Sequence, residues 1–190
     1  PWMGLPELRT ASPFEALAQA IIEQQIAWKT AQRAQRWLVE WGNHAITYAG
    51  RTYYDFPVPT QIATATIEIL KPLKITFRRM DTMIALSQQV ERGTLDIEGL
   101  LHVPAEDAYN TLVALKGIGH WTAAWTLQRA QGPHNYVGYN DVALQAAVNH
   151  YFYGAAGRIP AQQVSDTFAR YGDFAGLAAH HTILRWIIDR

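Results

Sequence analysis

Apolar residues recur along this chain at the three- to four-residue spacing that is typical of helices with one buried face. The pattern runs from Phe14 through Leu17 and Ile21 to Trp41, and it predicts one long amphipathic helix that ends at Gly42. Further helices are expected over residues 60–70, 76–91, 104–114, 120–131, 142–153, 160–171 and 174–189. No segment alternates apolar and polar residues for long enough to form a sheet, so the fold class is predicted to be all-α.

Two stretches between these helices have a distinctive composition. Residues 44–59 have no clear period, and their aromatic side chains are expected to cover a core rather than to bind a ligand: Tyr48, Tyr53, Tyr54 and Phe56. Basic side chains gather around the start of the helix at residues 76–91: Lys71, Lys74, Arg78 and Arg79. They could face phosphates, but a solvated surface is the simpler interpretation.

Length and composition limit the classes of protein. The chain has 190 residues, of which 49% are hydrophobic, and this is enough to bury a core as one domain or as two closely packed lobes. It has no apolar run long enough to span a membrane and no N-terminal signal segment. We therefore expect an intracellular protein without membrane contact.

Charge and cysteine content narrow the possible cofactors and partners. The chain contains no cysteine, which excludes disulfides, thiolate zinc sites and cysteine-ligated iron–sulfur clusters. The 16 basic and 16 acidic residues give a formal net charge of zero, so no overall field indicates a nucleic-acid partner. Charge alone would favour a small-molecule enzyme, and any contact with DNA must come from local geometry.

The stretch from Leu115 to Gly119, Leu-Lys-Gly-Ile-Gly, predicts a tight hairpin between two helices. Glycines at this spacing let the backbone turn at φ values that other residues avoid. A helix that begins directly after the turn, at His120, would point N–H groups outward, where they can bind an anion. An ordinary corner between two helices would have the same glycines, so the turn alone does not decide between these interpretations.

The residues after the turn are more specific. The Gly-Ile-Gly sequence is followed by Trp-Thr-Ala at residues 121–123 and, after a loop punctuated by glycine and proline, by Asp141. This arrangement resembles the helix-hairpin-helix and Gly/Pro-Asp loop (HhH-GPD) of a DNA glycosylase superfamily, in particular the branch typified by 3-methyladenine DNA glycosylase II. The hairpin would span about residues 104–131 and the catalytic loop about residues 132–141. The resemblance implies two packed helical lobes with a cleft between them, in one unit that covers residues 1–190. It also implies a compact form without the additional N-terminal mixed domain of typical bacterial members.

The same resemblance suggests how DNA would be held. In that superfamily the hairpin grips a DNA phosphate through backbone amides. The matching positions in this sequence are Gly117, Ile118, Gly119, His120 and Thr122. A Gln-Gln-Ile segment resembles the one from which a side chain enters the gap left by a flipped base, and it indicates Gln25 as this wedge. A solvated or helix-bridging pair of glutamines, Gln24 and Gln25, would explain the segment equally well.

Three tryptophans are candidates for a base pocket. By resemblance, Trp121 lies where the alkylbase enzymes stack an aromatic ring under the flipped base, and Trp186 borders the active site. Trp125 is one helical turn beyond Trp121, on the same face. An indole would stack on an alkylated purine and attract its positive charge. Without the motif, a tryptophan pair in a helical protein would be assigned to the core. His180 and His181 lie near Trp186 in the sequence, and we assign them no catalytic role.

Asp141 is the candidate catalytic residue. A carboxylate near the anomeric carbon stabilises the positive charge that builds on the sugar as the N-glycosidic bond breaks. A helix cap is the structural alternative, since Asn140 and Asp141 directly precede an apolar helical segment. Both roles can coexist if Asn140 caps the helix and Asp141 faces the cleft. The family often has Asp at both positions and Pro before them, so Tyr139-Asn140 departs from its pattern.

Position 121 also bears on the mechanism. Relatives that also cut the DNA backbone carry there the lysine that forms a Schiff base with the sugar, whereas this chain has Trp121, and Lys116 does not match. The resemblance also implies a sodium or similar ion on main-chain carbonyls of Val113, Leu115 and Ile118, with no cofactor for catalysis and no iron–sulfur cluster.

These features together predict a monofunctional glycosylase of base excision repair. It would excise 3-methyladenine-type alkylated bases from double-stranded DNA, act as a monomer and work in the cytoplasm with the nucleoid or in a nucleus. A glycosylase for oxidised or mismatched bases is one alternative. A helix-hairpin-helix module that binds DNA without catalysis is another, although such a module would need neither Trp121 nor Asp141.

Overall fold

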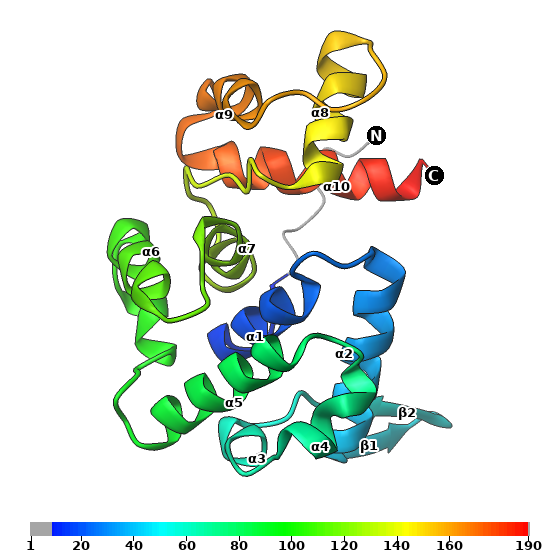
Figure 1. Ribbon diagram of the computed structural model, residues 1–190, viewed down its shortest axis with the longest axis vertical. Helices are drawn as coiled ribbons and strands as arrows, with labels where there is room; N and C mark the ends of the chain where they lie inside the picture. The colour runs from blue at the N-terminus through cyan, green and yellow to red at the C-terminus, as the bar shows by residue number, and fades with distance from the viewer. Residues whose placement is uncertain (1–8, 190) are drawn as a thin grey trace. The chain divides into compact units, whose positions relative to one another are not determined.

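The computed structural model describes residues 9–189, and the chain divides into two compact units (Figure 1). One unit is Leu17–Gly99, and the other combines the chain before Leu17 with the chain from Leu100 onward. Within residues 9–189 the structure has ten α-helices and a single two-stranded sheet. The all-α fold class is therefore confirmed.

The Leu17–Gly99 unit holds most of the helix α1 and the elements up to α5. The bounds of these elements are α1 Pro13–Glu23, α2 Trp28–Gly42, β1 Ala45–Tyr48, β2 Arg51–Tyr54, α3 Pro59–Ala63, α4 Ile67–Leu70, the 3₁₀ turn Lys71–Leu73 and α5 Phe77–Glu91. Helix α1 begins at Pro13, where the Glu15 amide donates a 3.1 Å hydrogen bond to Oγ of Ser12. That bond is the N-terminal cap that a Ser-Pro start favours.

The long helix predicted for residues 13–42 is wrong in one respect, because the structure breaks it in two. Gln25 has a left-handed backbone with φ of 51°, and Ala27, which precedes α2, is extended with ψ of 142°. A left-handed residue ends a right-handed helix. The break contains neither glycine nor proline, and the apolar spacing continues across it, so the sequence does not mark it.

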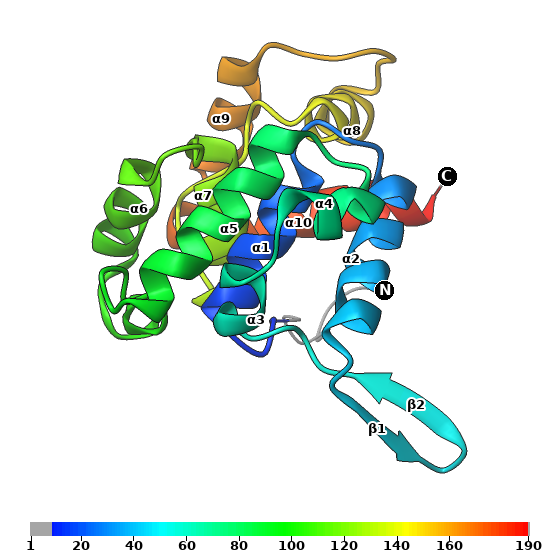
Figure 2. The ribbon, with the colours of Figure 1, turned by 60° about the horizontal axis from the view of Figure 1, so that its bottom comes forward.

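Three of the four aromatic residues, Tyr48, Tyr53 and Tyr54, do not cover a core, whereas Phe56 follows the strands and is half-buried. The three tyrosines lie on an antiparallel hairpin in which Ile46 pairs with Tyr53 and Tyr48 with Arg51, and Figure 2 shows it extending beyond the end of α2. Every residue of the two strands is exposed, and Tyr48 reaches 74%. The turn is Ala49-Gly50, with φ of 50° and 73°. Two positive φ values match the turn that two-residue hairpins favour, but alanine in the first position is a weak sequence signal.

Helix α5 begins one residue later than predicted, at Phe77, and one of its basic residues is placed differently from the prediction. Arg79 is only 8% exposed rather than solvated, while Phe77 is 62% exposed. The buried face is set by Met80, Met83 and Leu86, and Phe77 stands at the open end of that face. Burial lowers the pKa of the Arg79 guanidinium, and its Nη1 atom has no hydrogen-bond partner among residues 9–189.

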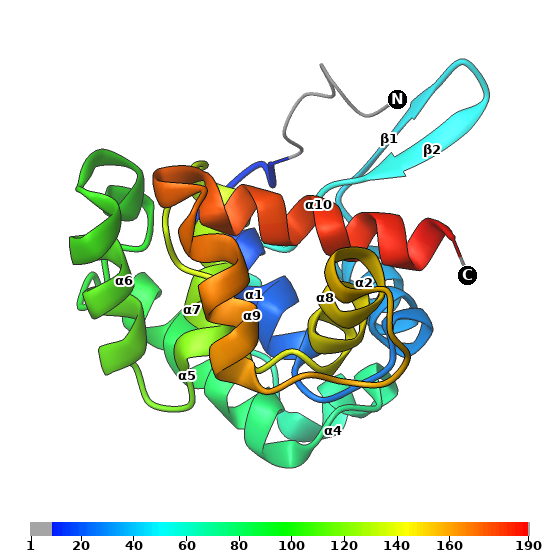
Figure 3. The same cartoon turned by 90° about the horizontal axis from the view of Figure 1, so that it is seen from above.

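The second unit contains the hairpin helices and three helices beyond them. They are α6 Ala105–Ala114, α7 His120–Ala130, α8 Val142–Tyr153, α9 Ala161–Ala169 and α10 Ala175–Ile188, with a 3₁₀ turn at Gly172–Phe174. Another 3₁₀ turn, Glu98–His102, contains the point at which the chain passes from one unit to the other. Helices α8, α9 and α10 pack on one another (Figure 3). No helix within residues 9–189 has both the length and the apolar character that crossing a membrane requires.

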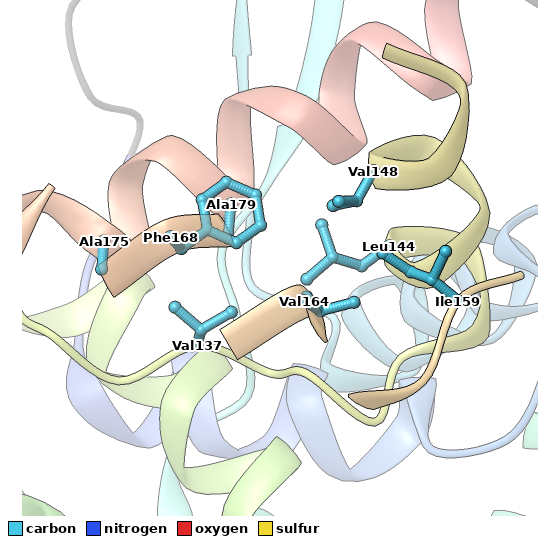
Figure 4. Close-up of a cluster of buried hydrophobic side chains, with 8 residues drawn as sticks. All are labelled: Val137, Leu144, Val148, Ile159, Val164, Phe168, Ala175 and Ala179. Carbon is cyan, nitrogen blue, oxygen red and sulfur yellow. The ribbon is translucent and has the colours of Figure 1, made fainter. Parts of the chain in front are cut away.

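A cluster of buried apolar side chains holds these last helices together. It comprises Val137, Leu144, Val148, Ile159, Val164, Phe168, Ala175 and Ala179 (Figure 4). Val137 and Leu144 stand on either side of Asp141 in the sequence, and both are buried. The loop that carries Asp141 is therefore anchored in the core at both of its ends.

Candidate functional site

The predicted hairpin is present between α6 and α7. The Ile118 amide donates a 3.1 Å hydrogen bond to the Leu115 carbonyl, and Gly117 has φ of 89°. Only Gly117 needs to be glycine for conformational reasons, because Gly119 is extended with φ of −101°. A Cβ added to Gly119 would meet nothing within 4 Å, so the surface in front of α7 is open at this residue. Ile118 is buried and fixes the turn to the core.

The start of α7 presents backbone amides at this open surface. The first turn is His120, Trp121 and Thr122, and the Ala123 amide makes the first bond back to the Gly119 carbonyl. Amides of a first turn have no partner within their own helix and carry the positive end of its dipole. The Thr122 side chain is 3% exposed, so Thr122 could reach a ligand only through its backbone.

The His120 side chain points back into the protein. Its Nε2 lies 2.6 Å from the Val137 carbonyl oxygen, its Nδ1 lies 2.9 Å from the Tyr109 hydroxyl, and its ring stacks on Tyr139 with centroids 4.2 Å apart. A carbonyl only accepts, so Nε2 carries a proton. The imidazole thus joins α6 to the loop before α8, and a DNA contact of His120 would have to use its backbone amide.

Asp141 is the N-cap of α8. Its Oδ1 accepts hydrogen bonds from the amides of Ala143 (2.8 Å) and Leu144 (2.9 Å), and its Oδ2 accepts one from the indole Nε1 of Trp121 (2.9 Å). The division of roles predicted for the pair is therefore wrong, because Asp141 and not Asn140 caps the helix. Asp141 has the extended backbone of an N-cap, with ψ of 121°, which aims its side chain at the first helical amides.

Trp121 and Trp125 are in contact but differ in exposure. Their rings meet edge to face with centroids 6.2 Å apart. Trp121 is partly exposed, whereas Trp125 is 5% exposed and also contacts His180. A base could therefore stack on Trp121 alone, with Trp125 as its support from within the core.

Gly138 lets the loop pass close to both indoles. A Cβ at Gly138 would lie 2.9 Å from Nε1 of Trp125 and 3.3 Å from Cδ1 of Trp121, too close for the loop to keep its path. The Gly138 carbonyl accepts a 2.9 Å hydrogen bond from the Asp141 amide. The contact of the Gly138 backbone with the two indoles therefore also fixes the backbone of Asp141.

Trp186 lies at the other end of α8. Its ring contacts His150 (5.7 Å between centroids) and Tyr151 (6.1 Å) in the second half of that helix. About 13 Å of helix separates this place from the cap at Asp141. These contacts of Trp186 are therefore with the far end of α8, and its place at the border of the base pocket stays a prediction.

Gln25 belongs to the Leu17–Gly99 unit. It is exposed and occupies the break between α1 and α2 with its left-handed backbone. A left-handed backbone costs a residue other than glycine about 1–2 kcal/mol. Residues held in such conformations cluster at functional sites, which is compatible with a wedge and does not establish one.

Two histidines of this unit, His134 and His180, have lowered pKa values. Burial lowers the pKa of His180 to about 4, with smaller contributions from the charges of Arg129 and His181, and burial lowers that of His134 to about 4 as well. Neither side chain is therefore a cation at neutral pH. Within residues 9–189, no group of three or more histidine or acidic side chains is arranged to hold a metal ion.

The chain is similar in sequence and in fold to known DNA glycosylases. No family model matches the chain. The chain is 32% identical over 127 residues to the DNA-3-methyladenine glycosylase of Bacillus subtilis, a match that covers 67% of this chain and 40% of that protein. Among solved structures, the 3-methyladenine DNA-glycosylase of Archaeoglobus fulgidus is 29% identical with a TM-score of 0.79, covering 93% of this chain and 59% of that one.

The fold extends to glycosylases of other specificity. The 8-oxoguanine glycosylase/lyase of Clostridium acetobutylicum, solved with double-stranded DNA, has a TM-score of 0.79 at 18% identity, covering 95% of this chain and 61% of that one. The architecture and the hairpin define a helix-hairpin-helix fold like that of these solved structures. The chain belongs to the HhH-GPD DNA glycosylase superfamily. It spans 40% of the Bacillus subtilis relative and 59% of the Archaeoglobus fulgidus chain.

Proposed function

We propose that this chain is a monofunctional DNA glycosylase that hydrolyses the N-glycosidic bond of alkylated bases flipped out of double-stranded DNA. The observation that carries the proposal is the pairing of Trp121 with Asp141, in which a partly exposed indole and a carboxylate are joined by a 2.9 Å hydrogen bond. Phosphate binding alone would require neither group. The names of the two 3-methyladenine glycosylase relatives support an alkylated substrate.

Trp121 supplies the surface on which the flipped base would stack. Flipping costs a few kcal/mol, and it costs least for damaged bases. A purine methylated at a ring nitrogen is cationic, so an indole face attracts it beyond ordinary stacking. The contact with buried Trp125 keeps this indole from turning away.

Asp141 would act at the sugar. As the bond from C1′ to the base nitrogen breaks, the sugar gains positive charge that a fixed carboxylate stabilises. A water molecule adds its oxygen to C1′ and gives up a proton, which the carboxylate can accept. An alkylated base that is cationic in DNA leaves as the neutral base, so no acid is needed at the base. The product is an abasic site.

Strand cleavage is not part of the proposed reaction. The lyase relatives use a lysine at the position that Trp121 occupies here. Lys116 precedes Gly117 in the turn and is exposed, so it does not replace that lysine.

DNA would be held without sequence readout. The backbone of Gly117, Ile118, Gly119, His120 and Thr122 would bind one phosphate, as the start of a helix after a glycine turn can do, and Gly119 is exposed there. A sodium or similar ion on the carbonyls of Val113, Leu115 and Ile118 would add positive charge next to that phosphate. Neutral carbonyl oxygens suit such an ion, although the Leu115 carbonyl already accepts the Ile118 amide.

The remaining parts of the proposal concern the wedge and the cellular setting. The exposed Gln25 would fill the gap left by the flipped base. The enzyme would act as a monomer, in the compartment that holds the genomic DNA: the cytoplasm of a bacterium or a nucleus.

The decisive experiment compares the wild type with Asp141→Asn on duplexes that carry one alkylated, oxidised or mismatched base. Abasic sites are scored with and without hot alkali, and borohydride trapping tests for a covalent adduct. The matched control is Asp173→Asn, which removes an exposed carboxylate outside the site. We expect release of alkylated bases by the wild type and the control, and a loss of at least about 100-fold in Asp141→Asn.

The other outcomes identify the alternatives. Release of only oxidised or mismatched bases would assign a different substrate class, and DNA binding without any base release would indicate a non-catalytic module. A trapped adduct would contradict the monofunctional assignment.

A further inference from the structure

We infer that His120 is a positioning residue, which holds the loop at residues 137–141 so that Asp141 reaches the reacting sugar. The inference rests on the proposed function. It starts from three contacts of one imidazole: Nε2 with the Val137 carbonyl (2.6 Å), Nδ1 with the Tyr109 hydroxyl (2.9 Å), and the ring face with Tyr139 (4.2 Å between centroids).

The two hydrogen bonds fix the proton positions of the ring. Nε2 donates, because the Val137 carbonyl can only accept. In the neutral imidazole Nδ1 then accepts, and the Tyr109 hydroxyl donates to it. Burial, with a smaller effect of Tyr139, raises the pKa of Tyr109, so this hydroxyl keeps its proton. Neither ring nitrogen of the neutral imidazole has a hydrogen-bonding site left for DNA.

Tyr109 is itself held in place. Its ring stacks on Tyr136 with centroids 3.9 Å apart and an interplanar angle of 4°. Stacked aromatic pairs contribute stability beyond their buried area. Tyr136 and Val137 are consecutive, so α6 holds the loop directly through Tyr109 and indirectly through His120.

The contacts of His120 hold the two residues next to Gly138. His120 holds Val137 and Tyr139, while the Gly138 backbone packs against the indoles of Trp121 and Trp125. The Tyr139 amide bonds to the Val137 carbonyl (2.7 Å), and the Asp141 amide bonds to the Gly138 carbonyl (2.9 Å). The loop is thus fixed on both sides just before the carboxylate.

His120 and Trp121, which are consecutive in α7, therefore hold two different parts of the loop. His120 holds the first part of the loop, and Trp121 binds the carboxylate at its end. Because a displacement of about 1 Å at a reacting group can cost on the order of 100-fold in rate, release of the His120 contacts should slow the chemical step more than it weakens DNA binding.

Three variants test the role of the ring. His120→Leu removes both hydrogen bonds, whereas His120→Gln keeps an amide donor with the reach of Nε2 for the Val137 carbonyl. Tyr109→Phe keeps the stack on Tyr136 and removes only the hydroxyl. The matched control is His102→Gln, an exposed histidine outside the loop.

Base release is measured in single turnover with saturating enzyme, and duplex affinity is measured separately. We expect His120→Leu to lower the release rate on the order of 10- to 100-fold, with duplex affinity within about threefold of the wild type. His120→Gln should recover part of the rate, and the control should leave it unchanged. Equal losses of rate and affinity in His120→Leu would overturn the inference in favour of direct DNA contact.

Amide hydrogen exchange without DNA tests, independently of activity, whether His120 holds the loop. In His120→Leu the amides of Tyr139 and Asp141 should exchange faster, while amides in the middle of α7 should not change. Unchanged exchange at Tyr139 and Asp141 would overturn the inference. If the wild type releases no base, the proposed function fails, and the exchange data still decide whether His120 holds the loop.

Discussion

The indole N–H of Trp121 donates to Oδ2 of Asp141 over 2.9 Å, while the other carboxylate oxygen accepts two amides of α8. The carboxylate therefore cannot rotate without giving up at least one of these bonds. A side chain that is held before substrate arrives need not be ordered during the reaction. The indole proposed to stack on a base and the carboxylate proposed to act at its sugar are therefore fixed relative to each other.

Replacing Trp121 with Phe separates stacking on a base from the hydrogen bond to Asp141. Phenylalanine keeps an aromatic face for stacking but cannot donate to Asp141. We expect base release in single turnover to fall on the order of 10-fold, and Trp121→Ala to fall further because stacking is lost as well. Equal rates for Trp121→Phe and the wild type would show that the hydrogen bond has no part in the reaction.

Asp141→Ser separates the helix cap from the chemistry. Serine caps a helix about as well as aspartate, so chemical denaturation should show a loss of less than about 1 kcal/mol in the free energy of unfolding. The carboxylate is absent, so base release should be abolished. Asp141→Ala, which removes the cap too, should be less stable than Asp141→Ser by about 1 kcal/mol. Substantial activity in Asp141→Ser would contradict a catalytic role.

Gly119→Ala tests how DNA approaches the hairpin. The added Cβ has nothing within 4 Å, and φ of −101° suits alanine, so the free energy of unfolding should change by no more than about 1 kcal/mol. A methyl group at this position would stand between the α7 amides and a phosphate. We expect duplex affinity to fall several-fold and its salt dependence to weaken. Affinity equal to that of the wild type would place the phosphate elsewhere.

The lowered pKa values of His134 and His180 indicate how the stability of the fold depends on pH. Burial lowers the pKa of His134 and His180 to about 4, below the ordinary value of about 6.5 that applies to the unfolded chain. Between these values the unfolded chain binds more protons, so stability falls as pH falls. From pH 6.5 to 5 each histidine should cost on the order of 1–2 kcal/mol. Urea denaturation at both pH values measures the loss, and His180→Gln should reduce the slope.

Much of the fold could be predicted from periodicity because helices repeat their apolar spacing over many residues. The break at Gln25 could not, since it has no glycine or proline and lies within an unbroken apolar pattern. The hairpin at Ala45–Tyr54 was missed for a related reason. Its strands are short, and an exposed strand has no buried face to impose alternation.

The candidate site could be predicted only in part. The order of the turn, Trp121 and Asp141 along the chain singled out two residues that the structure joins by a hydrogen bond. The bond between Trp121 and Asp141 and the capping role of Asp141 depend on side-chain direction, which sequence spacing does not record. His120 was missed as a loop contact because its partner, the Val137 carbonyl, is a backbone atom that any residue would supply.

The exposed hairpin also makes this protein easy to modify. All eight residues of β1 and β2 face solvent and bury no core surface, while the Asp55 amide donates a 2.8 Å hydrogen bond to the His44 carbonyl at its base. His44 and Asp55, which flank the two strands, are therefore held next to each other by a bond that does not involve the strands. A short peptide, a fluorophore attachment site or a small folded insert placed between them should leave the rest of the Leu17–Gly99 unit intact.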